Sequence, residues 1–412
     1  MRRPTPPSSR QVVLRALQTR ERELVEFARE LVAAPSPNPP GDERRVAQIL
    51  IQSMERLGYS NPRVMAMTQQ RPNVIGEIGG GSPVLMLNGH IDTKPPGDET
   101  RWETAPYDPV VRDGVLYGLG SSDMKAAVAA MVYAGAALGE LETRAGTLRL
   151  VLSADEEAGS HFGSRFLATS DELRADAAVV AEPTGLDVPW KYVATASRGV
   201  SAFRVRTLGT QMHSSLSDQV HAVNASVKLA QVLARMAKEF RPRHPAGTVS
   251  KPTVNLGVTL QGGVFFGVYP GAAEFGADVR TVPGMTLEGL QADVEDFLEG
   301  LRREDSELQV WAEWVPELTW SPPSAISSSH PIVEAARGAA REVLGRDIPP
   351  GTMPAFTDGT YWSLAGIPAI PAFGPGRLLF AHQPNEHVGV DEIIQASRIY
   401  ALMTTRFLDQ IS

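Results

Sequence analysis

LNGHIDTKPPGD, residues 87–98, places a histidine and an aspartate two positions apart, directly after a short apolar run. The run Val84–Leu87 is bounded by polar residues and glycine, which predicts a buried strand. His90 and Asp92 would follow the carboxyl end of that strand, where the Pro-Pro-Gly sequence turns the chain away. Because ligands of open parallel sheets bind beyond the carboxyl ends of the strands, both residues are candidates for a functional site.

Two more predicted strands end in acidic residues. Leu148–Ser153 is followed by Glu156 and Glu157, and Ala177–Val180 is followed by Glu182. If the three strands lie in one largely parallel sheet, these carboxylates reach the same edge of the sheet as the histidine.

Two further residues extend this group. Asp123 stands at the start of the predicted helix Met124–Leu138, and His382 lies in a loop near the C-terminus. Carboxylates within a few ångströms of one another cannot all stay ionised unless a cation neutralises them. Two metal ions about 3.5–4 Å apart need a shared carboxylate. Five residues therefore fit a site for two metal ions: His90, Asp123, Glu157, Glu182 and His382.

Two acidic residues remain beside these candidates. Asp92 could accept a hydrogen bond from the second nitrogen of His90 and so fix its tautomer. Glu156 could take a proton from a metal-bound water, which is the work of a general base. Each residue taken alone has a simpler alternative: Asp123 could be a helix N-cap, and Glu156 with Glu157 could form a solvated turn. The convergence on one edge favours the site.

The alternation of strands and helices predicts an α/β fold: a mixed, largely parallel sheet with helices on both faces. After Arg198 the pattern changes, and VSAFRVRTLG alternates apolar and polar residues as a strand with one exposed face does. We therefore expect a metal-binding catalytic domain at 1–199 and 317–412, into which a smaller α+β domain at 200–316 is inserted.

Composition limits the possible functions. The chain has 412 residues, 39 of them basic and 47 acidic, and a net charge of −8. This charge argues against nucleic acid or an anionic membrane as the partner and leaves a small-molecule substrate. Since there are no cysteines, disulfides, thiolate metal sites and a cysteine nucleophile are excluded. Histidine and carboxylate ligands favour zinc, manganese or cobalt.

The N-terminal residues 1–10, MRRPTPPSSR, are expected to be a disordered tail, and no apolar run of a signal peptide follows them. Leu17–Ala33 has the spacing of one helix. The longest apolar stretch, Ala126–Leu141, is too short for a membrane span and predicts a buried helix. We therefore expect a soluble, cytoplasmic protein.

The motifs around the candidate residues resemble one family. They are GHIDTKPPGD at 89–98, SADEEAGS at 153–160, AEPT at 181–184 and AHQPNEHV at 381–388. In kind and order they are similar to the metallopeptidase family of acetylornithine deacetylase, succinyl-diaminopimelate desuccinylase and the bacterial glutamate carboxypeptidases. The resemblance extends from Leu24 to Leu408.

The resemblance implies how two metal ions would be shared. Asp123 would bridge them, and the peptide bond between it and Met124 would be cis. Glu156 would act as the general base, and Asp92 would orient the first histidine ligand. The remaining ligands would divide into one pair for each ion: His90 with Glu182, and Glu157 with His382.

The inserted domain resembles the family's lid and dimerisation domain, which implies a homodimer. His213 in QMHSS would be offered to the active site of the partner subunit, where it could stabilise an oxyanion. Arg280 resembles the family's lid arginine and could bind a substrate carboxylate, with an internal ion pair as the alternative. Arg198 is a second candidate for the same task.

Loops of the catalytic domain resemble those that line the family's substrate pocket. Thr357, Asp358 and Gly374 are expected there. Asn385, grouped with them, is expected to brace, together with Glu386, the loop that carries the second histidine ligand.

The sequence departs from the family pattern at two places. Leu119 stands where relatives usually have an arginine, and Phe265 and Phe266 stand in a lid loop that usually carries an asparagine. The two phenylalanines would line an aromatic or apolar pocket or simply pack the lid. A specific substrate is therefore not transferred from the relatives.

The expected function is that of a dinuclear metal-dependent hydrolase. It would cleave an amide-type C–N bond of a small carboxylate-bearing molecule by attack of a metal-bridged hydroxide, as N-acyl amino acid deacylases and desuccinylases do. Two alternatives are a glutamate-carboxypeptidase-like exopeptidase and a hydrolase or deaminase of an aromatic C–N substrate. A non-catalytic ligand-binding homologue is the alternative of another class. Zinc is the expected metal, with manganese and cobalt as alternatives.

Overall fold

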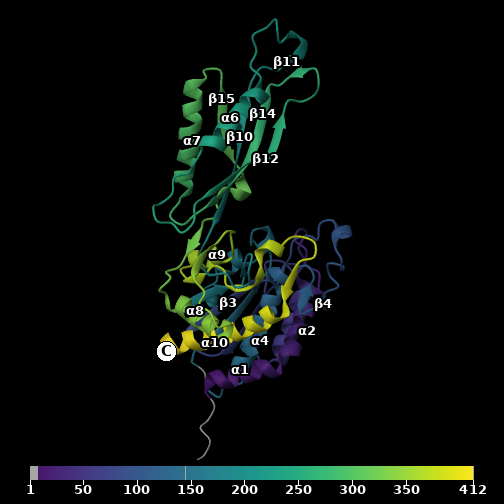
Figure 1. Ribbon diagram of the computed structural model, residues 1–412, viewed down its shortest axis with the longest axis vertical. Helices are drawn as coiled ribbons and strands as arrows, with labels where there is room; N and C mark the ends of the chain where they lie inside the picture. The colour runs from purple at the N-terminus through teal and green to yellow at the C-terminus, as the bar shows by residue number, and fades with distance from the viewer. Residues whose placement is uncertain (1–7, 144, 412) are drawn as a thin grey trace, which may run out of the picture. The chain divides into compact units, whose positions relative to one another are not determined.

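The strand that ends in His90 is β3 (Val84–His90), and it lies inside a six-stranded sheet with the order β1-β2-β6-β3-β7-β18 (Figure 1). This computed structural model describes residues 8–143 and 145–411. β3 is parallel to β6 and β7, and β7 is parallel to β18, whereas β2 is antiparallel to its neighbours β1 and β6. The other strands are β1 (Ser60–Met65), β2 (Asn73–Gly79), β6 (Thr147–Ser153), β7 (Ala177–Val180) and β18 (Ala369–Ile370).

Alternate residues of the central strands pack into two separate hydrophobic cores. In β6, Leu150 and Leu152 belong to one core and Val151 to the other, as the period of two in a strand requires. Helices cover both cores, which confirms the expected α/β fold. On the first face they are α1 (Ser9–Thr19), α2 (Glu21–Val32), α3 (Arg44–Arg56), α4 (Ala126–Gly139), α8 (Pro331–Leu344) and α10 (Val390–Ile411); on the second, α5 (Ser164–Leu167) and α9 (Gly359–Leu364).

α4 is buried along almost its whole length. Its residues from Ala126 to Leu138 are buried, and α2 and α10 pack against it (Figure 1). The predicted buried helix is therefore present. Among the residues that the structure describes, none of the helices combines the length and the apolar character that crossing a membrane would need.

The N-terminal segment differs from two expectations. Ser8 caps α1: its hydroxyl accepts a hydrogen bond from the backbone N–H of Gln11, whose side chain accepts one from the N–H of Ser8. This capping box starts a helix, so the predicted disordered tail is wrong for residues 8–10, while 1–7 lie outside the described residues. The single helix predicted from Leu17 is in fact interrupted at Arg20, whose backbone leaves the helical conformation between α1 and α2.

Short strands complete the first unit of the chain. β4, β5 and β20 form a three-stranded ribbon, and β8 pairs in parallel with β19. Their bounds, with those of the remaining short strands, are β4 (Val110–Arg112), β5 (Val115–Tyr117), β8 (Pro183–Gly185), β9 (Val193–Ser197), β16 (Ser324–Ala325), β17 (Pro350–Met353), β19 (Gly374–Arg377) and β20 (His387–Gly389).

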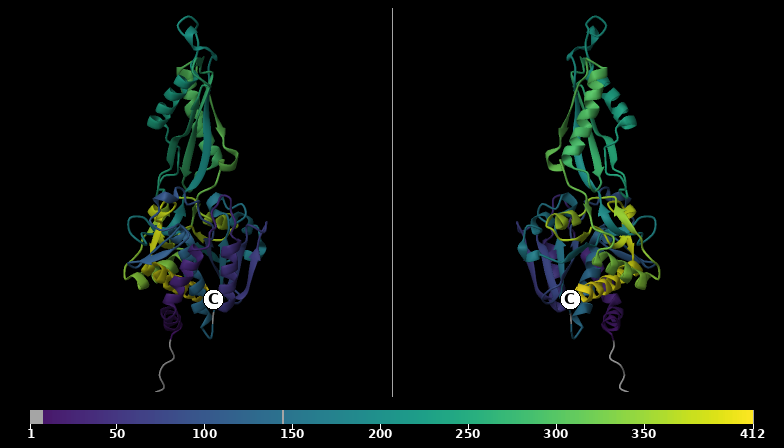
Figure 2. Two further views of the ribbon diagram at one scale, coloured as in Figure 1. Left: turned by 90° about the vertical axis from the view of Figure 1, so that its right-hand side faces the viewer. Right: turned by 90° about the vertical axis from the view of Figure 1, so that its left-hand side faces the viewer.

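A second sheet has the order β12-β14-β10-β15 and is antiparallel throughout. Side chains of α6 and α7 share one core with this sheet, so both helices lie on the same face of it (Figure 2). β11 and β13 pair with each other outside this sheet. The elements of this part of the chain are β10 (Gly199–Leu208), β11 (Met212–His213), α6 (Ala225–Glu239), β12 (Thr253–Gly262), β13 (Val268–Tyr269), β14 (Ala272–Thr281), α7 (Leu287–Glu304) and β15 (Gln309–Trp314).

The chain divides into two compact units. The first runs to Ala196 and continues over Ala325–Met353 and from Thr357 onward. The second is Ser197–Ser324, with Pro354–Phe356. The segment 200–316, expected to form an inserted domain, falls within the second unit.

Gly135 leaves room in α4 for the side chain of Tyr59. The Tyr59 hydroxyl donates a hydrogen bond to the carbonyl of Val132 at 2.7 Å. A Cβ atom on Gly135 would lie 2.0 Å from that hydroxyl. Glycine is therefore kept inside this helix because of a close side-chain approach.

We expect Gly135→Ala to destabilise the protein. The gain in helix propensity, about 0.5–1 kcal/mol, is smaller than the cost of displacing a buried ring, about 1–3 kcal/mol. The free energy of unfolding in urea measures the difference. Gly300→Ala in α7 is the matched control, since a Cβ atom there meets nothing within 4 Å, and it should be stabilising. A Gly135→Ala protein as stable as wild type would contradict the packing argument.

Candidate active site

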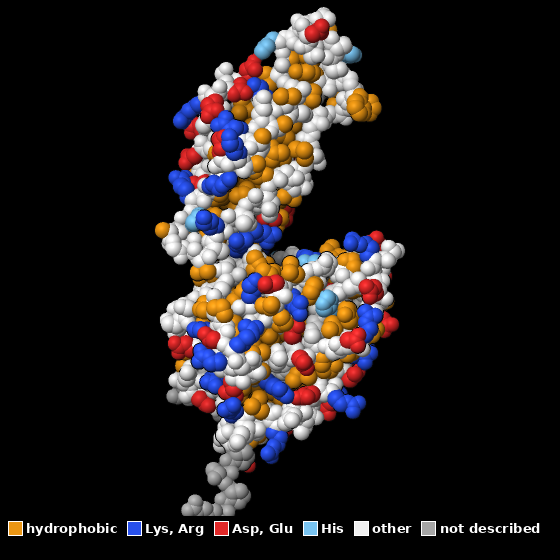
Figure 3. Space-filling view, in the orientation of Figure 1, with side chains coloured by type: hydrophobic (Ala, Val, Ile, Leu, Met, Phe, Trp, Pro, Cys, Tyr) orange, Lys and Arg blue, Asp and Glu red, His pale blue; other side chains and the backbone are white. Residues whose placement is uncertain are grey.

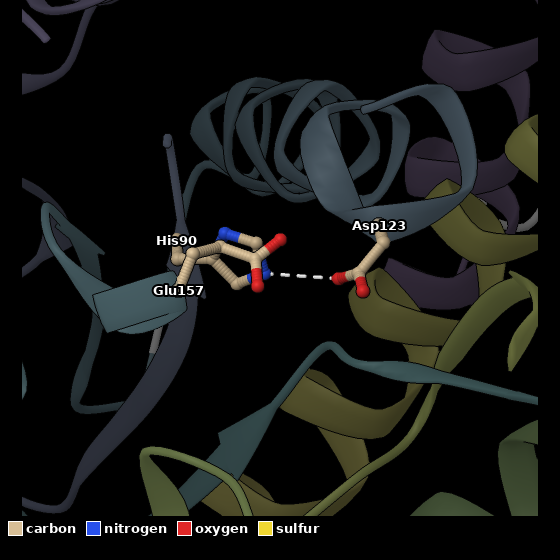
Figure 4. Close-up of side chains that lie close together, drawn as sticks. All are labelled: His90, Asp123 and Glu157. Carbon is tan, nitrogen blue, oxygen red and sulfur yellow. Dashed lines mark hydrogen bonds and ion pairs between the residues drawn. The ribbon is translucent and has the colours of Figure 1, made fainter. Parts of the chain in front are cut away.

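The ends of β3 and of the turn before α4 bring His90 and Asp123 together. Nε2 of His90 lies 2.9 Å from Oδ1 of Asp123, and Figure 4 shows Glu157 beside this pair. The peptide bond between Asp123 and Met124 is cis, as the resemblance implied. Burial raises the pKa of Asp123, but hydrogen bonds with His382 and His90 outweigh this effect and lower the pKa. The carboxylate is therefore held as an anion among ring nitrogens.

Asp92 is fully buried and lies on the other side of the His90 ring. Nδ1 of His90 is 3.1 Å from the backbone oxygen of Asp92 and 3.5 Å from its carboxylate Oδ1. The same carboxylate accepts hydrogen bonds from the backbone N–H groups of Glu156 and Glu157, at 3.2 and 3.1 Å, and from the amide of Asn38 at 2.8 Å. Asp92 thus connects the histidine to the turn that carries both glutamates.

His382 closes the site from the C-terminal part of the chain. Its Nε2 lies 2.9 Å from Oε1 of Glu157 and 3.3 Å from Oδ2 of Asp123. The backbone of His382 is left-handed, with φ of 61°, which turns the chain sharply at this residue. Its side chain is 42% exposed, so this side of the site is open to a ligand.

Glu182 and Glu156 complete the cluster. Oε1 of Glu182 is 3.6 Å from Nε2 of His90. Burial, and then the negative charge of Asp123, raises the pKa of Glu182 well above its usual value. Burial, and then the charge of Glu182, has the same effect on the pKa of Glu156. Two carboxylates are therefore held where their charged form is costly.

The donor set fits divalent metal ions. Ligand atoms of His90, Asp123 and Glu157 lie within 4.8 Å of one another, and so do those of His90, Glu156 and Glu182. Imidazole nitrogen and carboxylate oxygen are the ligands that zinc and manganese accept, and a divalent charge would offset the crowded anions. The cluster therefore has the composition and the electrostatic need of a metal centre.

A profile of peptidase family M20/M25/M40 matches residues 86–406, a span that contains the whole cluster. The chain belongs to this family. It is a metal-dependent hydrolase.

Two curated relatives match nearly all of the chain. The succinyl-diaminopimelate desuccinylase of Stenotrophomonas maltophilia is 26% identical over 93% of this chain and 99% of its own length. The acetylornithine deacetylase of Proteus mirabilis is 29% identical over 89% of this chain and 92% of its own length. A dinuclear metal-binding M20 peptidase of Bacillus subtilis shares the fold, with a TM-score of 0.69 and 17% identity over 96% of this chain and 100% of the other.

Asp358, expected to line the substrate pocket, is buried behind the turn that carries Glu156 and Glu157, which is called the glutamate turn below. Its carboxylate accepts hydrogen bonds from the hydroxyls of Ser153, Ser160 and Ser164, at 2.8, 2.5 and 2.6 Å. Thr357 beside it is also fully buried. These contacts make Asp358 a support of the turn.

Gly374 and Asn385, expected near the substrate, also contact other parts of the protein. A Cβ atom on Gly374 would lie 2.0 Å from the backbone oxygen of Ala181, so the glycine lets β19 approach the segment before Glu182. Asn385 accepts a hydrogen bond from the backbone N–H of Glu103 at 2.7 Å.

Glu386 has a more direct role than the sequence suggested. Its Oε1 accepts hydrogen bonds from the backbone N–H groups of Ser122 and Asp123, at 2.8 and 2.9 Å. It therefore holds the turn that presents Asp123, rather than only the loop of His382. Leu119, where relatives usually have an arginine, is buried.

The other expected residues lie in the second unit. Arg280 forms a two-pronged ion pair with Asp278, at 3.1 Å for both contacts, so the internal pair considered for it is present. Arg198 donates a hydrogen bond to the backbone oxygen of Lys251 at 3.0 Å. His213, in β11, is exposed, and its Nδ1 lies 2.7 Å from the hydroxyl of Ser215.

Phe265 and Phe266 are among the most exposed apolar side chains of the second unit, at 78% and 94%. Their rings contact each other edge to face, with centroids 6.0 Å apart. They do not belong to the core of this unit, so within a single chain they do not have the lid-packing role considered for them.

Lys94 and Asn38 lie near the cluster but were not predicted from the sequence. Lys94 donates to the backbone oxygen of Glu157 and lies 3.3 Å from its carboxylate Oε2. Asn38 binds Asp92. A signal existed for Lys94, which directly continues the HIDT motif, whereas Asn38 stands among prolines that indicate only a helix break.

We expect Glu182→Gln to raise the melting temperature of the metal-free protein, because it removes one of the mutually repelling carboxylates. It should weaken zinc binding, since a neutral amide is a poorer ligand. Zinc at 100 times its dissociation constant should stabilise the wild type by about 2.7 kcal/mol and the variant by less. Thermal unfolding with and without zinc measures both effects.

The control for this variant is Glu172→Gln, at an exposed glutamate that pairs with Arg63. It should change neither quantity. A metal-free Glu182→Gln protein that melts below wild type and responds fully to zinc would contradict the repulsion argument.

Proposed function

We propose that this chain is a deacylase of the desuccinylase and deacetylase type, which hydrolyses the amide bond of a small N-acyl amino acid. The observation that carries the proposal is the meeting of His90, Asp123, Glu157 and His382 with Glu156 beside them. The two relatives that cover nearly the whole chain are named for such reactions.

Two divalent ions, zinc first and manganese or cobalt as alternatives, would be held by this set. Asp123 is the bridging candidate, because its two carboxylate oxygens face different histidines: Oδ1 faces His90 and Oδ2 faces His382. Glu182 would join the first histidine and Glu157 the second. Bound ions of this kind polarise a carbonyl group and lower the pKa of water.

The protein's own residues would then direct the proton and the substrate. Glu156 accepts a proton from the attacking water as its oxygen bonds to the carbonyl carbon, and delivers the proton to the leaving nitrogen as the C–N bond breaks. Burial raises the pKa of Glu156 above its usual value, which makes its carboxylate a stronger base than that of an exposed glutamate. Asp92 keeps the ring of His90 in one orientation.

Two arginines and two phenylalanines are proposed to recognise the substrate. Arg280 and Arg198 are the proposed partners of a substrate carboxylate, although Arg280 would have to share its guanidinium with Asp278. The exposed pair Phe265 and Phe266 favours an aromatic or apolar acyl group. This observation keeps a second candidate function, hydrolysis of an aromatic C–N substrate or release of glutamate from an aromatic acyl group.

The second unit supports a homodimer in this proposal. Hydrophobic side chains gather along one side of it (Figure 3). The exposed large apolar residues of this unit include Val258, Leu260 and Val264. The edge strand β12 carries two of these residues, and an exposed edge strand is prone to pair with a second copy. His213 is proposed to act in the active site of the partner subunit. The cytoplasmic location expected from the sequence stays a prediction.

We expect the protein loaded with zinc, manganese or cobalt to hydrolyse members of a panel of N-acetyl, N-succinyl and aromatic N-acyl amino acids. Glu156→Gln should lower kcat by about 10²–10⁴-fold, because the variant has no base for the attacking water. Glu172→Gln serves again as the control. Binding of two metal equivalents without turnover of any panel member would favour a non-catalytic binding protein. Undiminished activity of Glu156→Gln would overturn the mechanism.

If His213 acts in the partner subunit, two inactive variants should complement each other. A mixed dimer of His213→Ala and Glu156→Gln subunits has one complete site, so an equimolar mixture refolded together should recover about a quarter of the wild-type activity. The activity of the mixture tests whether His213 acts across the dimer, and analytical ultracentrifugation of the wild type tests whether the dimer forms. A dimer whose mixture stays inactive would place His213 outside the partner's site.

A further inference from the structure

Asp155, the residue before the two glutamates, is held in an unfavourable backbone conformation. Its φ of 67° and ψ of 14° lie in the left-handed region, which residues with a side chain rarely occupy. The carboxylate accepts hydrogen bonds from the N–H of Phe162 at 3.0 Å, from the amide of Asn38 at 3.0 Å and from Nη2 of Arg71 at 2.7 Å. These contacts fix the start of the turn that carries Glu156 and Glu157.

Arg71 is the buried centre of these contacts. Besides Asp155, its guanidinium contacts the carboxylate of Glu43, with Nε 3.0 Å from Oε2, and donates to the side-chain oxygen of Asn38 at 3.4 Å. A Cβ atom on Gly41 would lie 1.7 Å from Nη1, so the loop around this glycine encloses the guanidinium. The arginine is therefore fixed on several sides.

Asn38 extends the same group to the histidine ligand. Its amide nitrogen donates to Asp155 and, at 2.8 Å, to Oδ2 of Asp92. Asp92 in turn accepts from the N–H groups of the glutamate turn and faces His90. The contacts thus run without a gap from Arg71 to the candidate metal ligands.

Stability alone does not account for so many buried charges. A buried ion pair often contributes less to stability than apolar side chains of the same volume would, because desolvation is costly. The cost is visible at Glu43: burial, and then the negative charge of Asp92, raises its pKa to about 8. A planar guanidinium fork does, however, fix the angles between its partners, which apolar packing cannot do.

We propose that Arg71, held by Glu43, is a positioning residue of this hydrolase: through Asp155 and Asn38 it fixes the turn that presents Glu156 and Glu157. It touches neither metal nor substrate. The proposal rests on the roles assigned to the two glutamates in the proposed function, but not on the identity of the substrate.

The test compares Arg71→Lys with Arg149→Lys. Lysine keeps the charge but cannot contact Glu43 and Asp155 with a fork. Arg149 pairs with Glu77 at 2.7 Å and is similarly sheltered, but it lies on β6 away from the strand's carboxyl end. Zinc titration of the metal-free proteins by calorimetry, and kcat and KM on the best panel substrate, are measured for both.

We expect Arg71→Lys to lower zinc affinity, kcat or both by about 10–100-fold, as changes to the partners of metal ligands do, with KM within about twofold of wild type. Arg149→Lys should change neither the zinc affinity nor kcat, although it should lower the melting temperature by a similar amount. Wild-type zinc affinity and kcat in Arg71→Lys, or equal losses in Arg149→Lys, would overturn the proposal.

A second variant separates positioning from folding. Arg71→Met combined with Glu43→Leu and Asp155→Asn replaces the arginine and both of its acidic partners by uncharged side chains of similar size, which should largely preserve stability. The proposal requires this stable protein to lose zinc affinity or kcat as Arg71→Lys does, and full retention of both would refute it. Because the zinc titration uses no substrate, it judges Arg71 even if no N-acyl amino acid is hydrolysed.

Discussion

Repulsion among carboxylates at one end of the central sheet is the constraint on which the rest of this structure depends. The carboxylates belong to Asp123, Glu156, Glu157 and Glu182. Parallel pairing makes the crowding unavoidable, because the register sets His90 opposite Ser153 and Asn88 opposite Val180. Buried contacts hold the turn of Glu156 and Glu157 on both sides. Three serine hydroxyls donate to Asp358 on one side, and the guanidinium of Arg71 donates to Asp155 on the other. A divalent cation would complete the charge balance in this metal-dependent hydrolase.

Local sequence patterns predicted the strands of the central sheet, because each strand is marked by the residues within it and beside it. β7 has the predicted bounds Ala177–Val180, since a short apolar run between polar residues has few other uses. The edge of the sheet that carries the candidate ligands followed from the strand ends. The interruption at Arg20 was not predictable, because no glycine or proline marks it. The buried contact between Arg71 and Asp155 could not be predicted for another reason. The two residues are 84 positions apart, and no local sequence pattern indicates that they meet.

Residues that the family resemblance placed near the substrate also make contacts within the protein that the sequence did not indicate. Asp358 and Gly374 are packed against the segments that carry the candidate ligands, and Arg280 is paired within its own strand. For Asp358 and Gly374, these contacts hold in place the segments that carry the candidate ligands. Phe265 and Phe266, which also differ from the family pattern, are exposed, and their role in substrate choice is part of the proposed function.

The contact between Glu386 and the backbone of Asp123 joins residues 263 positions apart. His382 comes from the same late segment. During synthesis on the ribosome, β3, β6 and β7 emerge first, and the second unit of the chain is made before either residue appears. Since domains fold as they emerge, these strands can pair and bring the acidic residues together before His382 and Glu386 are made. His382 and Glu386 are therefore the last parts of the candidate metal centre to be made, long after His90 and the four carboxylates that they join.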